Sequence, residues 1–390
     1  MRNEYGLVLF AAFMLLAGGL EVARGTESSS NRVSRYSFDL PPSVRLRSDG
    51  VSVYRKEIVS KVYTVDQLYK SMQGPQSMHS FDLAIGGPAE LLWLTGYESE
   101  IVGADADTEV SSEFMCHNDL LIDTNEYHKR FPTKIRTAGE RVFDLAQGQH
   151  ALQLPNGFGI PWMSNQKLNF NSQILNHNRV GETIEVRVKV AVEYIRDADL
   201  PRPLKPLVQR GAFGMKLLEG PDGHYGDSFD AVSLEDHGPG CSVGEDAEGS
   251  GHRTISDSEG RIFTGFWVVK PGRETNHTRI TPQLNVPYDT TLHYVSVHLH
   301  PFGESLALRD LTTGETLYES RARQVESGLG LTAVEHFSSE QGIPIFKDHE
   351  YELVSVYNNT SGEDQDAMTT MFLYLHAKDL YDFDFRPRPK

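Results

Sequence analysis

The sequence predicts an all-β protein made of two tandem antiparallel β-sandwich (jelly-roll) domains. Many short runs of β-branched and aromatic residues are separated by Gly, Pro, Asn and Asp, while amphipathic helical stretches of three or more turns are scarce. The segment 183–194 alternates almost perfectly and puts Ile184, Val188 and Val192 on one face, as in a half-buried antiparallel strand. Frequent short strands with turn signals between them favour sandwiches.

The other expected strands share this apolar, β-branched or aromatic character. In chain order, the strand-forming runs are residues 51–54, 91–94, 183–194, 262–269, 291–300, 351–357 and 371–375. A polar, glycine-rich stretch over residues 235–260 is expected to be a long loop, of the kind that often lines a site.

The N-terminal residues are expected to form a secretory signal peptide. An apolar run over residues 6–20 follows Arg2 and precedes Ala23 and Gly25, which are the small residues of a signal-peptidase site. An uncleaved membrane anchor is the alternative, although the run is short for a span. We therefore expect export to an extracellular or periplasmic location. The predicted segments are a signal peptide (1–25), a flexible N-terminus (26–48), an N-terminal β-sandwich domain (49–196), a Pro-rich linker (197–206) and a C-terminal β-sandwich domain (207–390).

The charge and the cysteines narrow the function. A formal net charge of −17 makes the chain a poor candidate for binding nucleic acid or anionic membranes, so neither is expected beyond the signal peptide. Of only two cysteines, Cys116 and Cys241 could form one disulfide after export. Cys116 stands next to His117 and could instead be a ligand or a free thiol.

His298 and His300 flank Leu299 within an apolar, strand-forming run. Successive side chains of a strand alternate between its faces, so these two imidazoles point the same way. Two imidazoles one pleat apart can hold one metal ion on a rigid sheet. The competing interpretation is one hydrogen-bonded histidine and one exposed histidine.

A methionine further along the chain supplies a third ligand of a different kind. Met368 ends a turn-rich loop and opens the apolar strand that follows. A thioether is a soft ligand that suits Cu(I), although most strand methionines only fill a core. Met371 is the alternative ligand. The two methionines are three residues apart, so only one of them can share a face with the histidines.

These motifs give residues from about 260 to 376 a resemblance to the copper type II ascorbate-dependent monooxygenases, the family of peptidylglycine α-hydroxylating monooxygenase and dopamine β-monooxygenase. The resemblance implies that His298, His300 and Met368 bind the copper that activates dioxygen. It also implies ascorbate or another external reductant as co-substrate.

The same family carries a second copper on three histidines of its first domain, and this copper takes electrons from ascorbate and relays them. The matching stretch here contains His117, but Asn118 stands where a second histidine is expected. A later strand offers His177, and Cys116 or His150 could be a third ligand. The alternative is a structural His117 and a solvent-facing His177. The animal enzymes contain several disulfides, so the two cysteines here make the animal substrates less expected.

The function predicted from these motifs is a secreted copper-dependent monooxygenase that hydroxylates a C–H bond of a small or peptidic substrate with O₂. The alternative is a non-catalytic extracellular copper-binding protein on the same fold. A third hypothesis is a metal-free extracellular module, in which His298 and His300 would be buried and hydrogen-bonded. A three-ligand site in the first domain would favour the oxygenase, and its absence the copper-binding protein.

Overall fold

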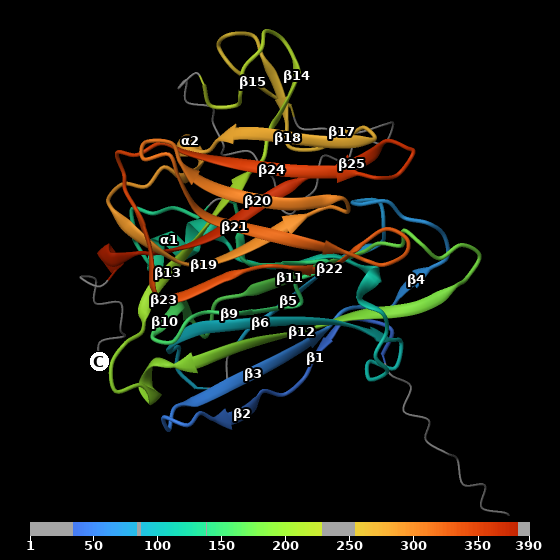
Figure 1. Ribbon diagram of the computed structural model, residues 1–390. Helices are drawn as coiled ribbons and strands as arrows, with labels where there is room; N and C mark the ends of the chain where they lie inside the picture. Colours follow the sequence, from blue (N-terminus) through green and yellow to red (C-terminus); the bar gives the residue numbers. More distant parts are fainter. Residues whose placement is uncertain (1–33, 84–86, 138, 228–253, 381–390) are drawn as a thin grey trace, which may run out of the picture. The chain divides into compact units, whose positions relative to one another are not determined.

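The computed structural model describes residues 34–83, 87–137, 139–227 and 254–380 (Figure 1). Strands make up most of them, which confirms the predicted all-β class. The α-helices of this described part are α1 (Thr124–Arg130) and the single turn α2 (Thr281–Leu284). None of its helices has the length and apolar character needed to cross a membrane. The predicted signal peptide, Cys241 and most of the predicted loop 235–260 lie outside the described residues.

One large sheet contains strands from both halves of the sequence. Its main path is β1 (Phe38–Asp39), β3 (Ser52–Val59), β12 (Ile184–Arg196), β6 (Leu91–Gly103), β10 (Phe158–Met163), β13 (Lys205–Phe213), β26 (Thr369–His376), β19 (Thr290–Leu299) and β23 (Phe337–Ile345). Three shorter strands pair alongside it, namely β2 (Ser43–Leu46), β4 (Tyr63–Val65) and β9 (Ala151–Gln153). The halves join where β10 and β13 pair in parallel, whereas the other strand pairs of this sheet are antiparallel.

Two further sheets position the candidate site. A four-stranded sheet consists of β5 (Gln76–Phe81), β11 (Leu168–Ile174), β7 (Met115–Leu121) and β8 (Arg141–Ala146), and its strand β8 packs against β19 and β13 of the large sheet. A five-stranded sheet consists of β18 (Gly272–Arg279), β24 (Tyr351–Asn359), β20 (Gly303–Asp310), β21 (Glu315–Gln324) and β22 (Leu331–Val334), most of which can be followed side by side in Figure 1.

The remaining strands form two small sheets. They are β14 (Lys216–Glu219), β16 (Ile262–Thr264) and β15 (Thr254–Ser256) in one sheet, and β17 (Trp267–Val269) and β25 (Gln365–Ala367) in the other. The predicted strand 262–269 is therefore two strands, β16 and β17, which belong to different sheets.

The structure differs from the sequence prediction at several boundaries. The expected flexible segment 26–48 contains β1 and β2, which both pair with β3 along the edge opposite β12. The expected linker 197–206 holds a 3₁₀ turn, Asp197–Asp199, and the first two residues of β13. The described residues between 34 and 380 cluster as one compact unit, so the division into domains at this linker stays a prediction.

Strand β12 is more deeply buried than its alternating pattern predicts. From Val190 to Ile195 side chains on both of its faces are buried, so both faces of the sheet are covered at this point. Even Arg187 is fully buried, and its guanidinium donates hydrogen bonds to the backbone oxygens of Ser60 at 2.8 Å and Ala104 at 3.0 Å. An alternating pattern cannot distinguish a solvated face from one whose polar side chains find partners inside the protein.

Candidate metal centre

The register between β19 and β26 determines which methionine faces the histidines. His298 lies opposite Thr370 and Leu299 opposite Thr369, and continuing this antiparallel register puts Met368 opposite His300. Residues directly opposite each other in an antiparallel pair project to the same face. Met371 lies opposite Val297 and therefore projects to the other face, into the core. Of the two methionines, Met368 shares the face of the histidines.

The rings of His298 and His300 are deeply buried, each residue being 3% exposed. Among the described residues, neither ring nitrogen of either histidine has a hydrogen-bond partner. His293, on the same strand, is equally buried, but its Nε2 lies 2.7 Å from Thr291 Oγ1 and its Nδ1 lies 2.9 Å from the Ser339 carbonyl oxygen. Buried polar groups without protein partners are normally satisfied by water or an ion, so the His-x-His pair differs from a structural core histidine.

His117 comes from β7 in the four-stranded sheet, and its ring lies near that of His298. Its ring centroid lies 6.4 Å from that of His298, and the His298 and His300 centroids are 5.4 Å apart. His117 is 1% exposed, and its Nδ1 has no partner among residues that the structure describes. The packing of the two sheets therefore brings together imidazoles that the sequence analysis assigned to two separate copper sites.

His177 follows β11 and lies on the outer side of this group. Burial is the main cause that lowers the pKa of the His300 ring, and the nearby ring of His177 lowers it further. The Nδ1 of His177 is buried without a partner in the described part of the chain. His177 also lines a pocket of about 250 Å³, together with Pro301, the residue that follows His300. His177 is thus neither distant from the site nor freely solvated, and it connects the buried histidines to a surface pocket.

Burial keeps all four imidazoles neutral. It is the first cause that lowers the pKa of His117, His177 and His298, and it lowers the pKa of His300 to about 3. Nearby imidazoles add to the effect at His298 and His300. Since only the neutral ring offers a lone pair to a metal, these histidines are in the protonation state that a ligand requires.

A buried charged cluster lies behind His117. The carboxylate of Asp119 accepts hydrogen bonds from Arg141 Nε at 3.0 Å and Asn171 Nδ2 at 3.1 Å, and its Oδ2 lies 3.8 Å from His117 Nε2. Burial opposes ionisation of Asp119, but Arg141 and a hydrogen bond with Asp144 hold its pKa below the usual range. Burial and the charge of Asp119 raise the pKa of Asp144, which therefore carries the proton of the pair. The carboxylate of Asp119 lies on the Nε2 side of His117, which leaves Nδ1 as the ring nitrogen without a partner among the described residues.

A tyrosine of the five-stranded sheet joins the backbones of two candidate ligands. The buried hydroxyl of Tyr357 donates to the Met368 carbonyl oxygen at 2.7 Å and accepts from the His300 backbone N–H at 3.4 Å. Phe266 packs edge-on against the His300 ring at a centroid distance of 5.4 Å. Tyr357 was not among the residues predicted from sequence, because no local pattern reveals a hydrogen bond between strands of different sheets.

The donor set suits copper. Metal–nitrogen bonds of about 2.0–2.1 Å at tetrahedral angles place two ring centroids about 5 Å apart, close to the observed 5.4 Å. Neutral imidazoles and one thioether are ligands that copper accepts in its reduced state, and the buried nitrogens have lone pairs to offer. Across the described residues, no three His, Cys, Asp or Glu side chains already converge on one point.

The first-domain site was expected to use Cys116 or His150 as a third ligand, with Asn118 at the place of the second histidine. Cys116 is buried and has no disulfide partner among the described residues, and burial raises the pKa of its thiol to about 12, so that it is not poised as a thiolate. Asn118 donates to Ser99 Oγ at 2.8 Å. His150 lines a separate pocket of about 210 Å³ with Arg55 and other charged residues.

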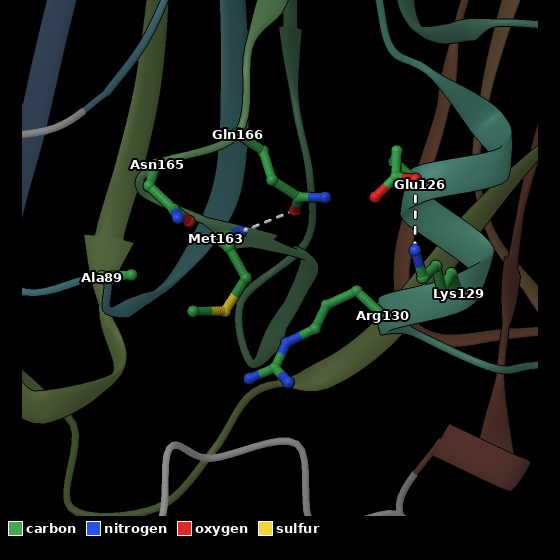
Figure 2. A pocket seen from close by; sticks show the side chains of 7 residues that line it. All are labelled: Ala89, Glu126, Lys129, Arg130, Met163, Asn165 and Gln166. Carbon is green, nitrogen blue, oxygen red and sulfur yellow. Dashed lines mark hydrogen bonds and ion pairs between the residues drawn. The ribbon is translucent and has the colours of Figure 1, made fainter.

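A further pocket, of about 480 Å³, has none of the candidate histidines in its lining (Figure 2). Arg130 and Met163 border it, and Gln166 is held by a contact of its Oε1 with the Met163 backbone N–H at 3.4 Å. In the lining drawn in Figure 2, the charged side chains come from α1, and Glu126 pairs with Lys129 at 3.5 Å. Because it contains none of the metal-binding side chains discussed above, this pocket has no part in the candidate site.

Comparison with known proteins gives little further information. No family model matches the chain, and no curated protein matches it. One solved structure that it resembles is described as "Crystal Structure of the STIV MCP"; the match covers 83% of this chain and 98% of that chain, with 8% sequence identity and a TM-score of 0.27.

Proposed function

We propose that the protein is a copper-dependent monooxygenase that hydroxylates a C–H bond of a small substrate with O₂ and an external reductant such as ascorbate. The observation that carries this proposal is the group of neutral, buried imidazoles of His117, His298 and His300, whose nitrogens include five without partners among the described residues. Met368 lies in register on the same face. In this proposal His298, His300 and Met368 hold the copper.

Bound copper would supply one-electron redox chemistry with dioxygen. The protein's own groups do the rest. The rigid strand β19 fixes two imidazoles at a set separation, and Tyr357 holds the backbone of Met368 beside that of His300. Phe266 and the surrounding sheets exclude bulk water, and the pocket of about 250 Å³ beside His177 offers space for a small molecule next to the buried site.

One observation favours a second candidate, a non-catalytic extracellular copper-binding protein. The ring of His117 lies 6.4 Å from that of His298, so His117 and His177 belong to one chain of imidazoles and not to a separate relay site. An oxygenase needs electrons delivered one at a time, and a single group of ligands with no second copper would suit storage or transport of the ion.

Metal content and oxygen consumption test both candidates. Purified protein should bind copper, and His298→Ala should abolish or strongly weaken binding, whereas His293→Ala, at the hydrogen-bonded histidine of the same strand, should not. If the wild-type protein takes up no copper, both candidates are refuted. Ascorbate-driven O₂ consumption that depends on an added C–H substrate supports the oxygenase, and copper binding without such turnover supports the binding protein.

A further inference from the structure

The pocket beside His177 is strongly acidic. Glu363, Asp364 and Asp366 contribute carboxylates to its lining, against the single amine of Lys70. Within the described ranges, none of the three acids forms an ion pair with a lysine or arginine. The pocket therefore presents uncompensated negative charge toward solvent, and such a concave acidic surface raises the local concentration of cations.

The pocket leads toward the candidate metal centre. Pro301, in its lining, directly follows His300 in the chain. His300 is 97% buried with two unpartnered ring nitrogens in the part of the chain that the structure describes. His177 is half-buried, lines the same pocket as the acids and has an Nδ1 without a partner among the described residues.

One pocket therefore combines acidic side chains, an imidazole and the residue that follows the buried His300. We propose that this pocket is the entrance through which a copper ion reaches the buried histidines, with the carboxylates attracting the ion and His177 binding it first. This inference rests on the proposed copper function. It gives His177 a role in loading, which differs from the electron-relay ligand that the family resemblance implies.

The rate of copper loading tests this inference separately from copper binding itself. Trp267 provides a signal, because its ring lies 6.0 Å from that of Tyr357, next to His300 and Met368. Copper(II) quenches tryptophan fluorescence on binding nearby, so stopped-flow mixing of metal-free protein with Cu²⁺ gives a loading rate, and the final amplitude together with metal analysis gives the amount bound.

The triple variant Glu363→Gln/Asp364→Asn/Asp366→Asn should load roughly tenfold more slowly than wild type at low salt, because steering by charge changes association rates by an order of magnitude or more. It should reach the same final copper content, and added salt should reduce the difference. A matched control removes three exposed acids outside the pocket lining. The control substitutions are Glu315→Gln, Glu340→Gln and Asp348→Asn.

Equal loading rates for the triple variant and the control would overturn the inference, since net charge alone would then explain any change. His177→Ala should also slow loading and leave the final copper content unchanged. Loading at the wild-type rate in His177→Ala, or a loss of bound copper at equilibrium, would refute the loading role. Failure of the wild-type protein to bind any copper is a different outcome and overturns the proposed function instead.

Discussion

Replacing Tyr357 by Phe removes one hydroxyl and keeps the ring. That hydroxyl donates to the Met368 carbonyl oxygen at 2.7 Å and accepts from the His300 N–H at 3.4 Å, in a buried position. A net hydrogen bond contributes about 0.5–1.5 kcal/mol, and a buried carbonyl left without a partner costs about 1–3 kcal/mol. We expect the free energy of unfolding of the metal-free protein to fall by about 1–3 kcal/mol.

The same substitution should weaken copper binding. Met368 and His300 are held relative to each other through this hydroxyl, and loss of a supporting hydrogen bond around a metal typically lowers affinity about 10–100-fold. The free energy of unfolding is measured by denaturant titration of metal-free protein, and copper affinity by competition with a chelator of known affinity.

Tyr351→Phe is the matched control. Tyr351 lies at the other end of the same strand, and its hydroxyl also bridges backbone groups, donating to the Phe346 oxygen at 3.1 Å and accepting from the Phe346 N–H at 2.7 Å. It should cost similar stability without changing copper affinity. If Tyr357→Phe and Tyr351→Phe lower stability alike and both leave copper affinity unchanged, Tyr357 does not position the ligands.

Three other predictions concern the ligand set, the bound metal and acid stability. Met368→Leu should lower Cu(I) affinity by about tenfold or more with a smaller effect on Cu(II), because a soft ligand is lost, while Met371→Leu on the opposite face should leave both affinities unchanged in chelator competition. Removing copper by dialysis against a chelator should lower the thermal midpoint, since metal at a hundredfold excess over its Kd stabilises by about 2.7 kcal/mol; an unchanged midpoint would contradict a native-state site. Burial lowers the pKa of His128 to about 4, and its Nε2 accepts from the Thr137 N–H at 3.3 Å. The unfolded chain therefore binds the extra proton between about pH 6.5 and 4, and stability should fall by about 1–2 kcal/mol as the pH drops through that window, after allowance for partial solvent screening. His128→Gln should flatten this dependence in urea titrations at several pH values, and an equally steep slope in the variant would assign it to other groups.

The fold class and several of the strands could be predicted from sequence, because both depend on local pattern. The choice between Met368 and Met371 needed only the register of β19 against β26, which alternation suggests and strand pairing decides. The proximity of His117 to His298 could not be predicted. It arises from the packing of β7 and β8 against β19, which connects segments distant in sequence.

The partners of buried polar side chains could not be predicted from sequence either. Nothing in the local sequence of Asp119 and Asp144 indicates that they share a proton behind His117, since they are brought together by strand pairing of β7 with β8. Likewise, Arg187 interrupts an apolar strand and would be assigned to solvent by pattern alone. Such residues are found only when the partner that compensates their burial is known.

The parallel contact between β10 and β13 has a consequence for the order of events during folding. Antiparallel neighbours can pair through a short turn, whereas this junction and the packing of β8 on β19 need both halves of the chain to be synthesised and brought together. The imidazoles of His117 and His298 are therefore far apart in any partly folded chain. Under the proposed function, copper would then be retained only by molecules that have completed folding, and its uptake would mark the native state during maturation.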